Sequence, residues 1–410
     1  MTTENPCPVP HPGGHRKSVR AGEAAEPGAE AVGGTWHVRS LPLVRQVLRE
    51  GDATVQAGFN AETAHEGLAR TPVLFMDGPE HRRQRAAIAR YFTPATVGRR
   101  YRGLMEELAD ELVEGIRRDG GCELSRVTMR YSVEIAAQVV GLTESGTDGM
   151  SVRLDRFFGL PFVPPGEEGA GGRPLGVALR ARVRSVRSLV AVGAFFLRDV
   201  RPAIAARRAA PREDVISHLL EEGYGDREIL TECITYAAAG MATTREFIAM
   251  AAWHLLDDPR LRERYLAAEE AERYAVLHEI LRLEPVVGHL YRRAVRDLVL
   301  VDGDERHEVP AGAVLDLYVR QANADPGAFG DDALSLCPAR ERPTGARPEG
   351  VSFGDGPHRC PGNFLAIQES DVFLQRLLRL PLELAEPPRL GWEDLIAGYQ
   401  LRDVALRVRA

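Results

Sequence analysis

One segment of this chain constrains its fold more than any other. Residues 226–258 contain no proline, and apolar side chains recur along them at the spacing of an α-helix. Asp226 is a typical N-cap residue, and the sequence Asp257-Asp258-Pro259 is typical of a helix end. A helix over these 33 residues is about 50 Å long. We therefore expect it to cross the whole domain.

The middle of this expected helix is unusual. Residues 237–244 read Ala-Ala-Ala-Gly-Met-Ala-Thr-Thr, so small side chains leave the backbone uncovered, and Gly240 weakens the helix. Two interpretations stay open at this point. Another helix crosses closely here, or a flat or bulky ligand lies against the uncovered backbone.

The chain as a whole is predicted to be mainly α with a small β-region. Of its 410 residues, 44% are hydrophobic and only 67 are Gly or Pro, so a large core is expected. Residues 1–34, rich in Pro, Gly, Ala and Glu, predict a flexible N-terminal arm, and residues 35–410 a single large domain. Strands are predicted at 298–301 and 314–319. The Gly- and Pro-rich residues 161–174 predict a mobile loop that gates access to the interior.

Charge and hydropathy exclude several classes of protein. Acidic residues outnumber basic ones, 59 to 52, and there is no basic tail, so nucleic acid is not an expected partner. The longest apolar run, residues 189–197, is too short for a membrane span. The polar N-terminal residues do not resemble a signal peptide, so a cytoplasmic location is expected. Lys17 is the only lysine among the basic residues, a coding bias that favours a bacterial source.

A glycine-rich loop near the C-terminus carries the strongest chemical signal. The sequence Phe-Gly-Asp-Gly-Pro-His-Arg-Cys-Pro-Gly at residues 353–362 leads into an expected helix with Cys360 at the junction. A helix N-terminus and free backbone N–H groups favour the thiolate form of such a cysteine, and small neighbours let a broad ligand approach the sulfur. These properties suit an iron ligand, whereas a cysteine taken at random is an inert residue in a turn.

This loop resembles the haem-binding loop of the cytochrome P450 family. Phe353, Gly356, Cys360 and Gly362 match the pattern F-x-x-G-x-x-x-C-x-G, and His358 stands in its usual place. The resemblance extends over about two thirds of the chain and implies the P450 fold, a haem b cofactor (iron protoporphyrin IX) and Cys360 as the iron ligand.

Further motifs of the family occur in the family's order. Glu279 and Arg282 match its E-x-x-R pair, and the resemblance implies that they form a buried structural network with Arg340. Four residues are implied as partners of the two haem propionates, with Arg293 as a neighbouring alternative to one of them: His81, Arg85, Arg292 and His358.

The central segment resembles the oxygen-binding motif A/G-G-x-D/E-T-T. Gly240 and Thr243 match it, and the resemblance implies that Thr243 is catalytic and donates a hydrogen bond to the bound dioxygen. Ala242 departs from the pattern, because an acidic residue that relays protons normally stands there. Glu246 follows one helical turn later, but a solvent-facing glutamate is the simpler interpretation. The proton route stays open among Thr243 with water, the substrate and Glu246.

By resemblance, this chain is a bacterial monooxygenase of secondary metabolism that oxidises, and most readily hydroxylates, a small lipophilic natural product. It is expected to be a monomer that uses dioxygen and takes electrons from a separate ferredoxin or flavodoxin-type donor. Two alternatives stay open: a haem-thiolate enzyme of unusual reaction type (oxidative coupling, cyclisation or nitration), and a sensor or binding protein that does not oxygenate. The substrate pocket is expected to include Met241, Ala242, Val287, His289 and Tyr399.

Overall fold

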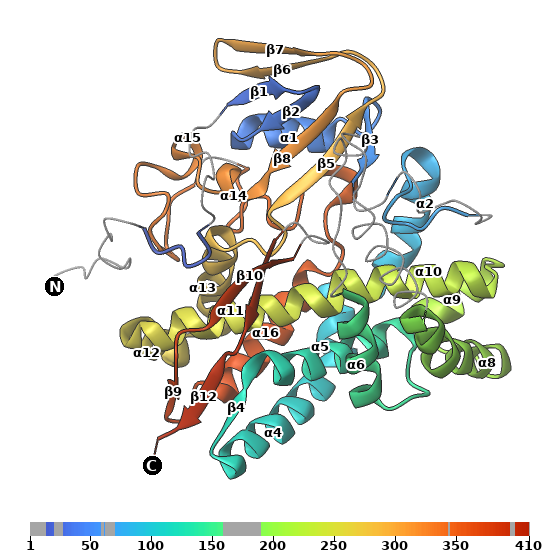
Figure 1. Cartoon of the computed structure of the whole chain (residues 1–410), viewed down its shortest axis with the longest axis vertical. Coiled ribbons are helices and arrows are strands. Elements are labelled where there is room, and N and C mark those ends of the chain that lie inside the picture. Colours follow the sequence, from blue (N-terminus) through green and yellow to red (C-terminus); the bar gives the residue numbers. More distant parts are fainter. Residues whose placement is uncertain are drawn as a thin grey trace, which may run out of the picture.

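The computed structural model describes residues 14–19, 28–58, 61, 70–158, 190–342, 345–393 and 398–409. The long helix predicted from the sequence is present and runs through the molecule (Figure 1). It consists of α10 (Asp226–Tyr236), a π-helical segment η3 (Ala237–Ala242) and α11 (Thr243–Asp257), which follow one another without a break. The π-helical turn falls on the small residues singled out above. Such turns are frequent at functional sites.

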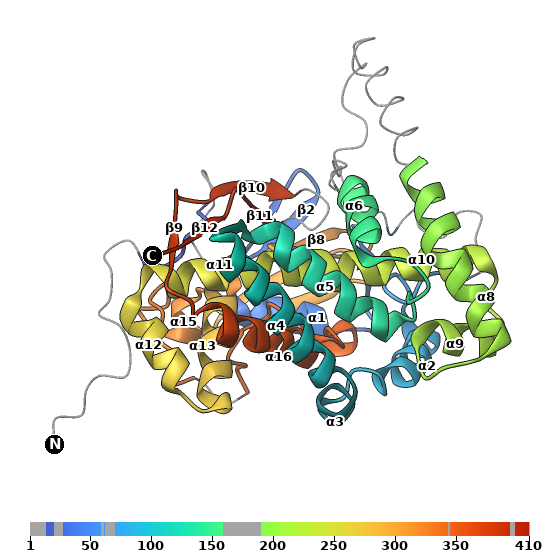
Figure 2. The same ribbon diagram turned by 90° about the horizontal axis from the view of Figure 1, so that it is seen from below.

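Other helices pack along this central one (Figure 2). Helix α11 contacts α5, α13 and α16, and α16 also lies against α4. Because α11 is covered on nearly every side, most of its residues are buried. The remaining long helices are α4 (Arg102–Asp119), α5 (Leu124–Val140), α6 (Thr147–Phe158), α8 (Arg201–Ala209), α9 (Val215–Glu221), α12 (Pro259–Ala267), α13 (Glu270–Leu283) and α16 (Asn363–Leu377).

The small β-region is built around a five-stranded sheet in the order β1-β2-β8-β5-β3. One core cluster joins this sheet to α1 (Leu41–Arg49) through Val38, Leu315 and Leu317. Its strands are β1 (Ala29–Val32), β2 (Thr35–Val38), β3 (Thr54–Ala57), β5 (His289–Ala294) and β8 (Val314–Tyr318). The smaller sheets comprise β4 (Gly121–Glu123), β6 (Leu298–Asp302), β7 (Glu305–Val309), β9 (Leu382–Leu384), β10 (Arg389–Glu393), β11 (Gly398–Arg402) and β12 (Ala405–Val408).

The predicted fold class, mainly α with a small β-region, is confirmed. Both predicted strand regions are strands, and β6 turns into β7 after Asp302. The other strands were not predicted, because they are short and pair with partners far along the chain, as Thr35 of β2 does with Val314 of β8. No helix within the described ranges is long and apolar enough to cross a membrane.

The structure differs from the predicted flexible arm at residues 14–19. Ser18 is fully buried, and its hydroxyl lies between Arg320, which donates to it, and Glu284. Arg16 donates to the carbonyl oxygen of Leu283 at 2.7 Å. The composition of the N-terminal residues predicted a flexible segment, but hydrogen bonds to the end of α13 fix residues 14–19 on the domain. The loop predicted at 161–174 lies outside the described residues.

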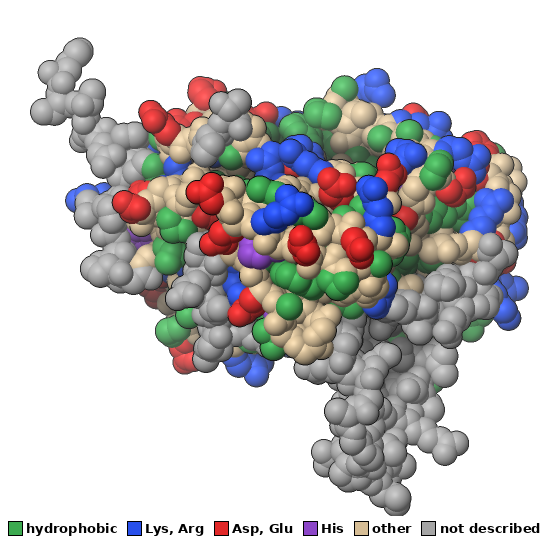
Figure 3. All heavy atoms as spheres, turned by 90° about the horizontal axis from the view of Figure 1, so that it is seen from above, with side chains coloured by type: hydrophobic (Ala, Val, Ile, Leu, Met, Phe, Trp, Pro, Cys, Tyr) green, Lys and Arg blue, Asp and Glu red, His purple; other side chains and the backbone are tan. Residues whose placement is uncertain are grey.

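The face of the molecule that carries the five-stranded sheet has no large patch of one charge. Basic and acidic side chains alternate across the part of this face seen in Figure 3, with hydrophobic side chains scattered between them. This distribution agrees with the small net charge of −7. It gives no sign of a nucleic-acid surface on this face.

Candidate functional site

The loop before α16 is held in one conformation by its glycines and by α1. Gly356 has φ +64°, and a Cβ atom there would lie 2.2 Å from the carbonyl oxygen of Leu48 in α1. The side chain of Asp355 accepts hydrogen bonds from Arg45 at 3.1 Å and Arg49 at 3.0 Å. Only glycine fits at position 356, because both the backbone angle and the close approach exclude a side chain.

Cys360 lies at the end of this loop as a free thiol. Its N–H donates to the carbonyl oxygen of Phe353 at 2.8 Å, which closes the loop. Burial raises the pKa of the Cys360 thiol, although a hydrogen bond from Gly362 and the charges of Arg85 and Arg359 act in the opposite direction. The predicted preference for the thiolate is therefore wrong for the protein alone, because desolvation outweighs the helix N-terminus. A metal ion deprotonates a coordinating thiol outright.

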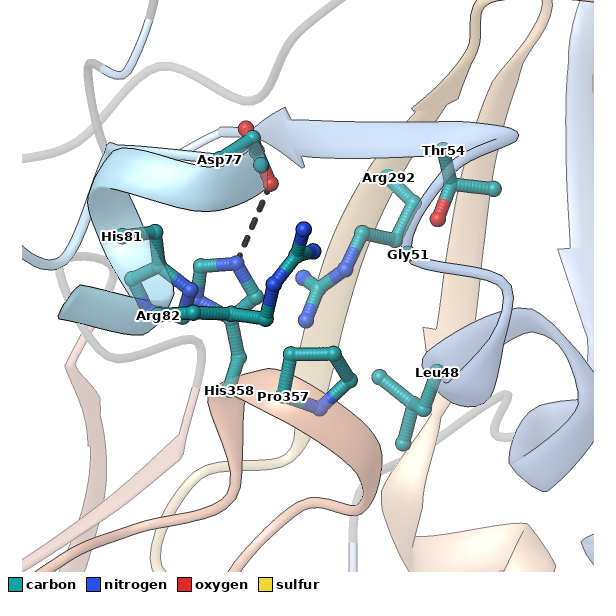
Figure 4. A pocket seen from close by; sticks show the side chains of 10 residues that line it. Leu48, Gly51, Thr54, Asp77, His81, Arg82, Arg292, Pro357 and His358 are labelled. Atoms are coloured by element: carbon teal, nitrogen blue, oxygen red, sulfur yellow. Dashed lines mark hydrogen bonds and ion pairs between the residues drawn. The ribbon is translucent and has the colours of Figure 1, made fainter. Parts of the chain in front are cut away.

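A pocket beside the Cys loop gathers three of the residues predicted to bind propionates (Figure 4). His81 and Arg82 reach it from α2 (Gly78–Ala89), Arg292 from β5 and His358 from the short helix η4 (Gly356–His358). The rings of His81 and His358 stack with centroids 3.9 Å apart. The full lining is Leu48, Gly51, Thr54, Asp77, Gly78, His81, Arg82, Arg292, Pro357 and His358.

The two histidines of this pocket are held uncharged. Burial, with the neighbouring charges of His358 and Arg85, lowers the pKa of His81 to about 3. Burial also lowers the pKa of His358, whose Nε2 lies 3.1 Å from the carboxylate of Asp77. The Nε2 atom of His81 is buried and has no hydrogen-bond partner among the described residues. It is therefore an unused polar atom at the edge of the pocket.

One buried arginine, Arg292, and one partly buried arginine, Arg85, add positive charge to the same region. Burial lowers the pKa of Arg292 to about 10, and only Asp77 opposes this. Arg85 donates to the carbonyl oxygen of Arg359, and burial lowers its pKa while Cys360 and Tyr236 act to raise it. The structure thus brings Arg292 into the pocket, whereas Arg293 donates to Gly312 at 3.1 Å.

This arrangement fits a haem whose propionates enter the pocket. Asp77 is the one carboxylate among the described residues whose charge acts on His81 and Arg292, so this cationic region lacks negative charge. Two propionates would supply that charge and a partner for the Nε2 atom of His81. Arg85 lies within electrostatic range of Cys360 on one side and Tyr236 of α10 on the other. The residues present therefore match the group that the sequence motifs imply.

The π-helical segment forms the opposite wall. Ala239 is exposed and Gly240 and Thr243 are partly exposed, although this segment lies in the middle of the molecule. The hydroxyl of Thr243 donates to the carbonyl oxygen of Ala239 at 2.6 Å. A helix face with small, accessible side chains leaves room for a broad ligand. Both interpretations of this segment have support, because α5 also crosses it closely, with Ala136 beside Gly240.

The position of Ala242 offers no acid, and Glu246 does not replace it. Ala242 is buried. Glu246 is only 1% exposed, accepts a hydrogen bond from the N–H of Leu401 at 2.7 Å and pairs with Arg245 and Arg402, each at 2.7 Å. The interpretation of Glu246 as a solvent-facing residue is wrong, because the C-terminal hairpin covers this side of α11.

A second buried carboxyl lies close to the central threonines. Glu369 of α16 is 3% exposed and forms a hydrogen bond with Thr244, the neighbour of Thr243. Burial raises the pKa of Glu369 well above its usual range, although the hydrogen bond with Thr244 acts in the opposite direction. Sequence reasoning missed it, since only the packing of α16 on α11 brings the two helices together.

The E-x-x-R residues lie together in the interior, away from the pocket. Arg282 donates to both carboxylate oxygens of Glu279, at 2.8 and 2.7 Å, and to the carbonyl oxygen of Asn323 at 2.6 Å. The Nε atom of Arg340 lies 3.3 Å from the same carboxylate. This network ties α13 to the two segments that carry Asn323 and Arg340.

Three of the five residues expected in the substrate pocket are buried. Met241 and Tyr399 are fully buried in the core, and Ala242 is nearly so. Val287 is partly buried, and His289 donates or accepts a hydrogen bond at 2.7 Å with Asp316 of β8. The structure therefore does not place Met241, Ala242 or Tyr399 on an accessible wall.

Comparison with known proteins agrees with this geometry. A family model described as Cytochrome P450 matches residues 274–381. Cytochrome P450(MEG) of Priestia megaterium is 26% identical over 91% of this chain and 89% of its own length. Nocardicin C N-oxygenase of Nocardia uniformis subsp. tsuyamanensis is 28% identical over 88% of this chain and 86% of its own length. A solved structure of a mutant of P450 EryK in complex with erythromycin B superposes with a TM-score of 0.73 at 22% identity over 93% of each chain.

The fold of these solved neighbours is the one implied by the sequence motifs, so the predicted P450 fold is confirmed. The predicted haem cofactor is confirmed with it, because the family uses iron protoporphyrin IX. Since the Cys loop, the cationic pocket and the interrupted central helix all agree with the matches along the chain, the protein belongs to the cytochrome P450 family of haem-dependent monooxygenases.

Proposed function

We propose that this chain is a monooxygenase in which Cys360 is the sole protein ligand of the haem iron and that it hydroxylates a lipophilic natural-product intermediate. The observation that carries the proposal is the placement of Arg85, which lies within electrostatic range of both Cys360 and Tyr236 of the central helix. A site bounded by these two residues lies between the Cys loop and α10. Cys122 and Cys233, the other free thiols, lie elsewhere, in β4 and on α10.

The pocket residues would hold the haem by its propionates. Arg85 and Arg292 would donate charge-assisted hydrogen bonds, and the neutral rings of His81 and His358 would supply further partners. Burial of these groups keeps water out and strengthens each interaction. When bound through a thiolate, haem supplies the activation of dioxygen and the oxidation of the substrate.

Thr243 would hold the proton that the reaction consumes. Its hydroxyl now donates to Ala239, and rotation about χ1 frees Oγ to donate into the site. Ala242 cannot supply a proton, and the carboxylate of Glu246 is occupied by two arginines. We therefore assign proton delivery to Thr243 with ordered water, while the buried carboxyl of Glu369 forms a hydrogen bond with the neighbouring Thr244.

Two partners complete the proposal. Two matches support a natural product as the substrate. One is the solved neighbour in complex with erythromycin B, and the other is the relative named Nocardicin C N-oxygenase. Electrons would come from a ferredoxin-type donor, because the P450 fold implies a redox partner.

Incorporation of oxygen from labelled dioxygen tests this proposal. Candidate natural products are first screened for a change in the haem absorption spectrum on binding. A ligand found in this way is then incubated with the holoenzyme, a ferredoxin, its reductase and isotopically labelled dioxygen. We expect a product heavier by one labelled oxygen atom. Binding without donor-dependent oxidation would instead support a sensor or binding protein.

A reaction of unusual type is a second candidate, and Ala242 is the observation that favours it. Without the acid, a reaction that needs fewer protons than hydroxylation loses less. If the reaction is coupling, ring closure or nitration, the substrate is consumed in the labelled-dioxygen experiment but the product contains no added hydroxyl group. The mass of the product separates the two candidates.

A further inference from the structure

Glu232 of α10 is a buried carboxyl that the functions assigned above do not use. Its side chain is 2% exposed, and its Oε1 atom accepts a hydrogen bond from the N–H of Val73 at 2.8 Å. Its Oε2 atom is buried and has no hydrogen-bond partner among the described residues. A buried carboxylate oxygen without a donor is costly, so such an atom calls for an explanation.

The position of Glu232 on the central helix points to the substrate side. Glu232 and Tyr236 are spaced i and i+4 on α10, so they share one face of that helix. The exposed Ala239 follows three residues after Tyr236, in the π-helical segment that walls the site. The rise of a helix places Glu232 about 16 Å from Thr243. A substrate lying along the helix would reach Glu232 with its far end.

The electrostatic surroundings of Glu232 lack a positive charge. Burial raises the pKa of Glu232 to about 7, and only the N–H of Val73 opposes this. No cation among the described residues contributes to that balance. The pKa of Tyr236 is raised by Glu232 and lowered by Arg85, so both side chains lie within electrostatic range of Tyr236.

We propose that Glu232 determines substrate specificity by binding a protonated amine at the end of the substrate remote from the reacting carbon. This inference rests on the proposed function and deepens it by naming the substrate class. An ammonium group would supply the hydrogen-bond donor that Oε2 lacks. It would also supply a positive charge to balance the carboxylate. A neutral hydroxyl would supply only the donor and would leave the buried charge unpaired.

Binding of two matched probes to the holoenzyme tests the inference. N,N-dimethyldecylamine carries the ammonium on a chain of suitable length, and 1-decanol carries a neutral hydroxyl on the same chain. Affinities are measured by calorimetry and by the change of haem spin state, in the unmodified protein, in Glu232→Gln and in Glu221→Gln. Glu221 is an exposed residue at the end of α9 and serves as the control.

We expect the amine to bind the unmodified protein about ten-fold more tightly than the alcohol. Glu232→Gln should abolish this preference and leave the affinity for the alcohol unchanged, while Glu221→Gln should change neither. Calorimetry in two buffers of different ionisation enthalpy should show proton release when the amine binds near pH 7, because the ammonium ionises Glu232. Glu232→Gln should bind without that release, a difference that a purely structural role would not produce.

Several results would overturn the inference: equal affinities for the two probes, no binding of the amine, a preference that survives in Glu232→Gln, or a spectrum showing the amine nitrogen on the iron. The absorption spectrum of the reduced carbon monoxide complex is recorded for every variant. Loss of its thiolate band would count against the proposed function. An intact thiolate band without an amine preference would count against Glu232 alone.

Discussion

At the scale of single residues, the site is distinguished by acids whose roles depend on their surroundings. Glu232 and Glu369 are buried with raised pKa values, whereas Glu246 is buried and paired with Arg245 and Arg402. All three lie close to the central helix or on it. Their chemistry therefore differs because their partners differ.

The first prediction concerns the proton donor. Thr243→Ala should lower the ratio of product formed to electrons consumed by about ten-fold and divert the electrons to peroxide, because the hydroxyl that positions the proton is lost. Thr243→Ser should restore most of the coupling. Peroxide and product are measured together in the reconstituted system. Full coupling in Thr243→Ala would move the assignment to the substrate's own polar groups.

Glu246→Gln provides the matched comparison. Removing one carboxylate from a buried ion pair with two arginines should lower the free energy of unfolding by about 3 kcal/mol. The ratio of product to electrons consumed should stay unchanged in the protein that remains folded. A fall in this ratio without a loss of stability would show that Glu246 relays protons after all.

The third prediction follows from the pKa of Glu232. This pKa is about 7 in the folded protein, against 4.5 for an ordinary glutamate side chain, so the folded state keeps a proton that the unfolded state loses. Stability from this group is complete below pH 4.5 and falls by about 3 kcal/mol as the pH rises to 7. Glu232→Gln should lack this fall. Thermal unfolding of both proteins at pH 5 and pH 8 measures it, and an identical pH dependence would contradict the assignment.

At the scale of elements, the Cys loop depends on its fit against α1. Gly356→Ala would place a methyl group 2.2 Å from the carbonyl oxygen of Leu48 at a φ of +64°. We expect a loss of about 3 kcal/mol in the free energy of unfolding and poor retention of haem.

Gly303→Ala is the control for backbone strain, because Gly303 has a similar φ of +58° and no atom within 4 Å of the added Cβ. It should cost only about 1 kcal/mol and leave haem content unchanged. Haem content per chain and the midpoint of thermal unfolding are measured for both variants. Equal effects would show that the contact with Leu48 does not matter.

The elements also show what the sequence can predict. The central helix and the glycine-rich loop were predictable, because local periodicity and a dense local motif specify them. The buried state of Glu246 was not, since it depends on Leu401 and Arg402, far along the chain. The same holds for the bond between Glu232 and Val73 and for the docking of Ser18 beside Glu284. These contacts arise from tertiary packing alone.

At the scale of the whole molecule, two walls define the site. The Cys loop and the cationic pocket form one, and the interrupted central helix forms the other, with Arg85 within electrostatic range of both. The account therefore requires a haem held between them and ligated through Cys360. Every function assigned to Thr243, Glu232 and the pocket depends on that ligation.

The absorption spectrum of the reduced carbon monoxide complex tests this claim most directly. The unmodified holoenzyme and Cys122→Ser, a control that removes a free thiol in β4, should both show the band of a thiolate-ligated haem. Cys360→His should bind haem but lose that band, because imidazole replaces sulfur as the ligand. Persistence of the thiolate band in Cys360→His would contradict the account.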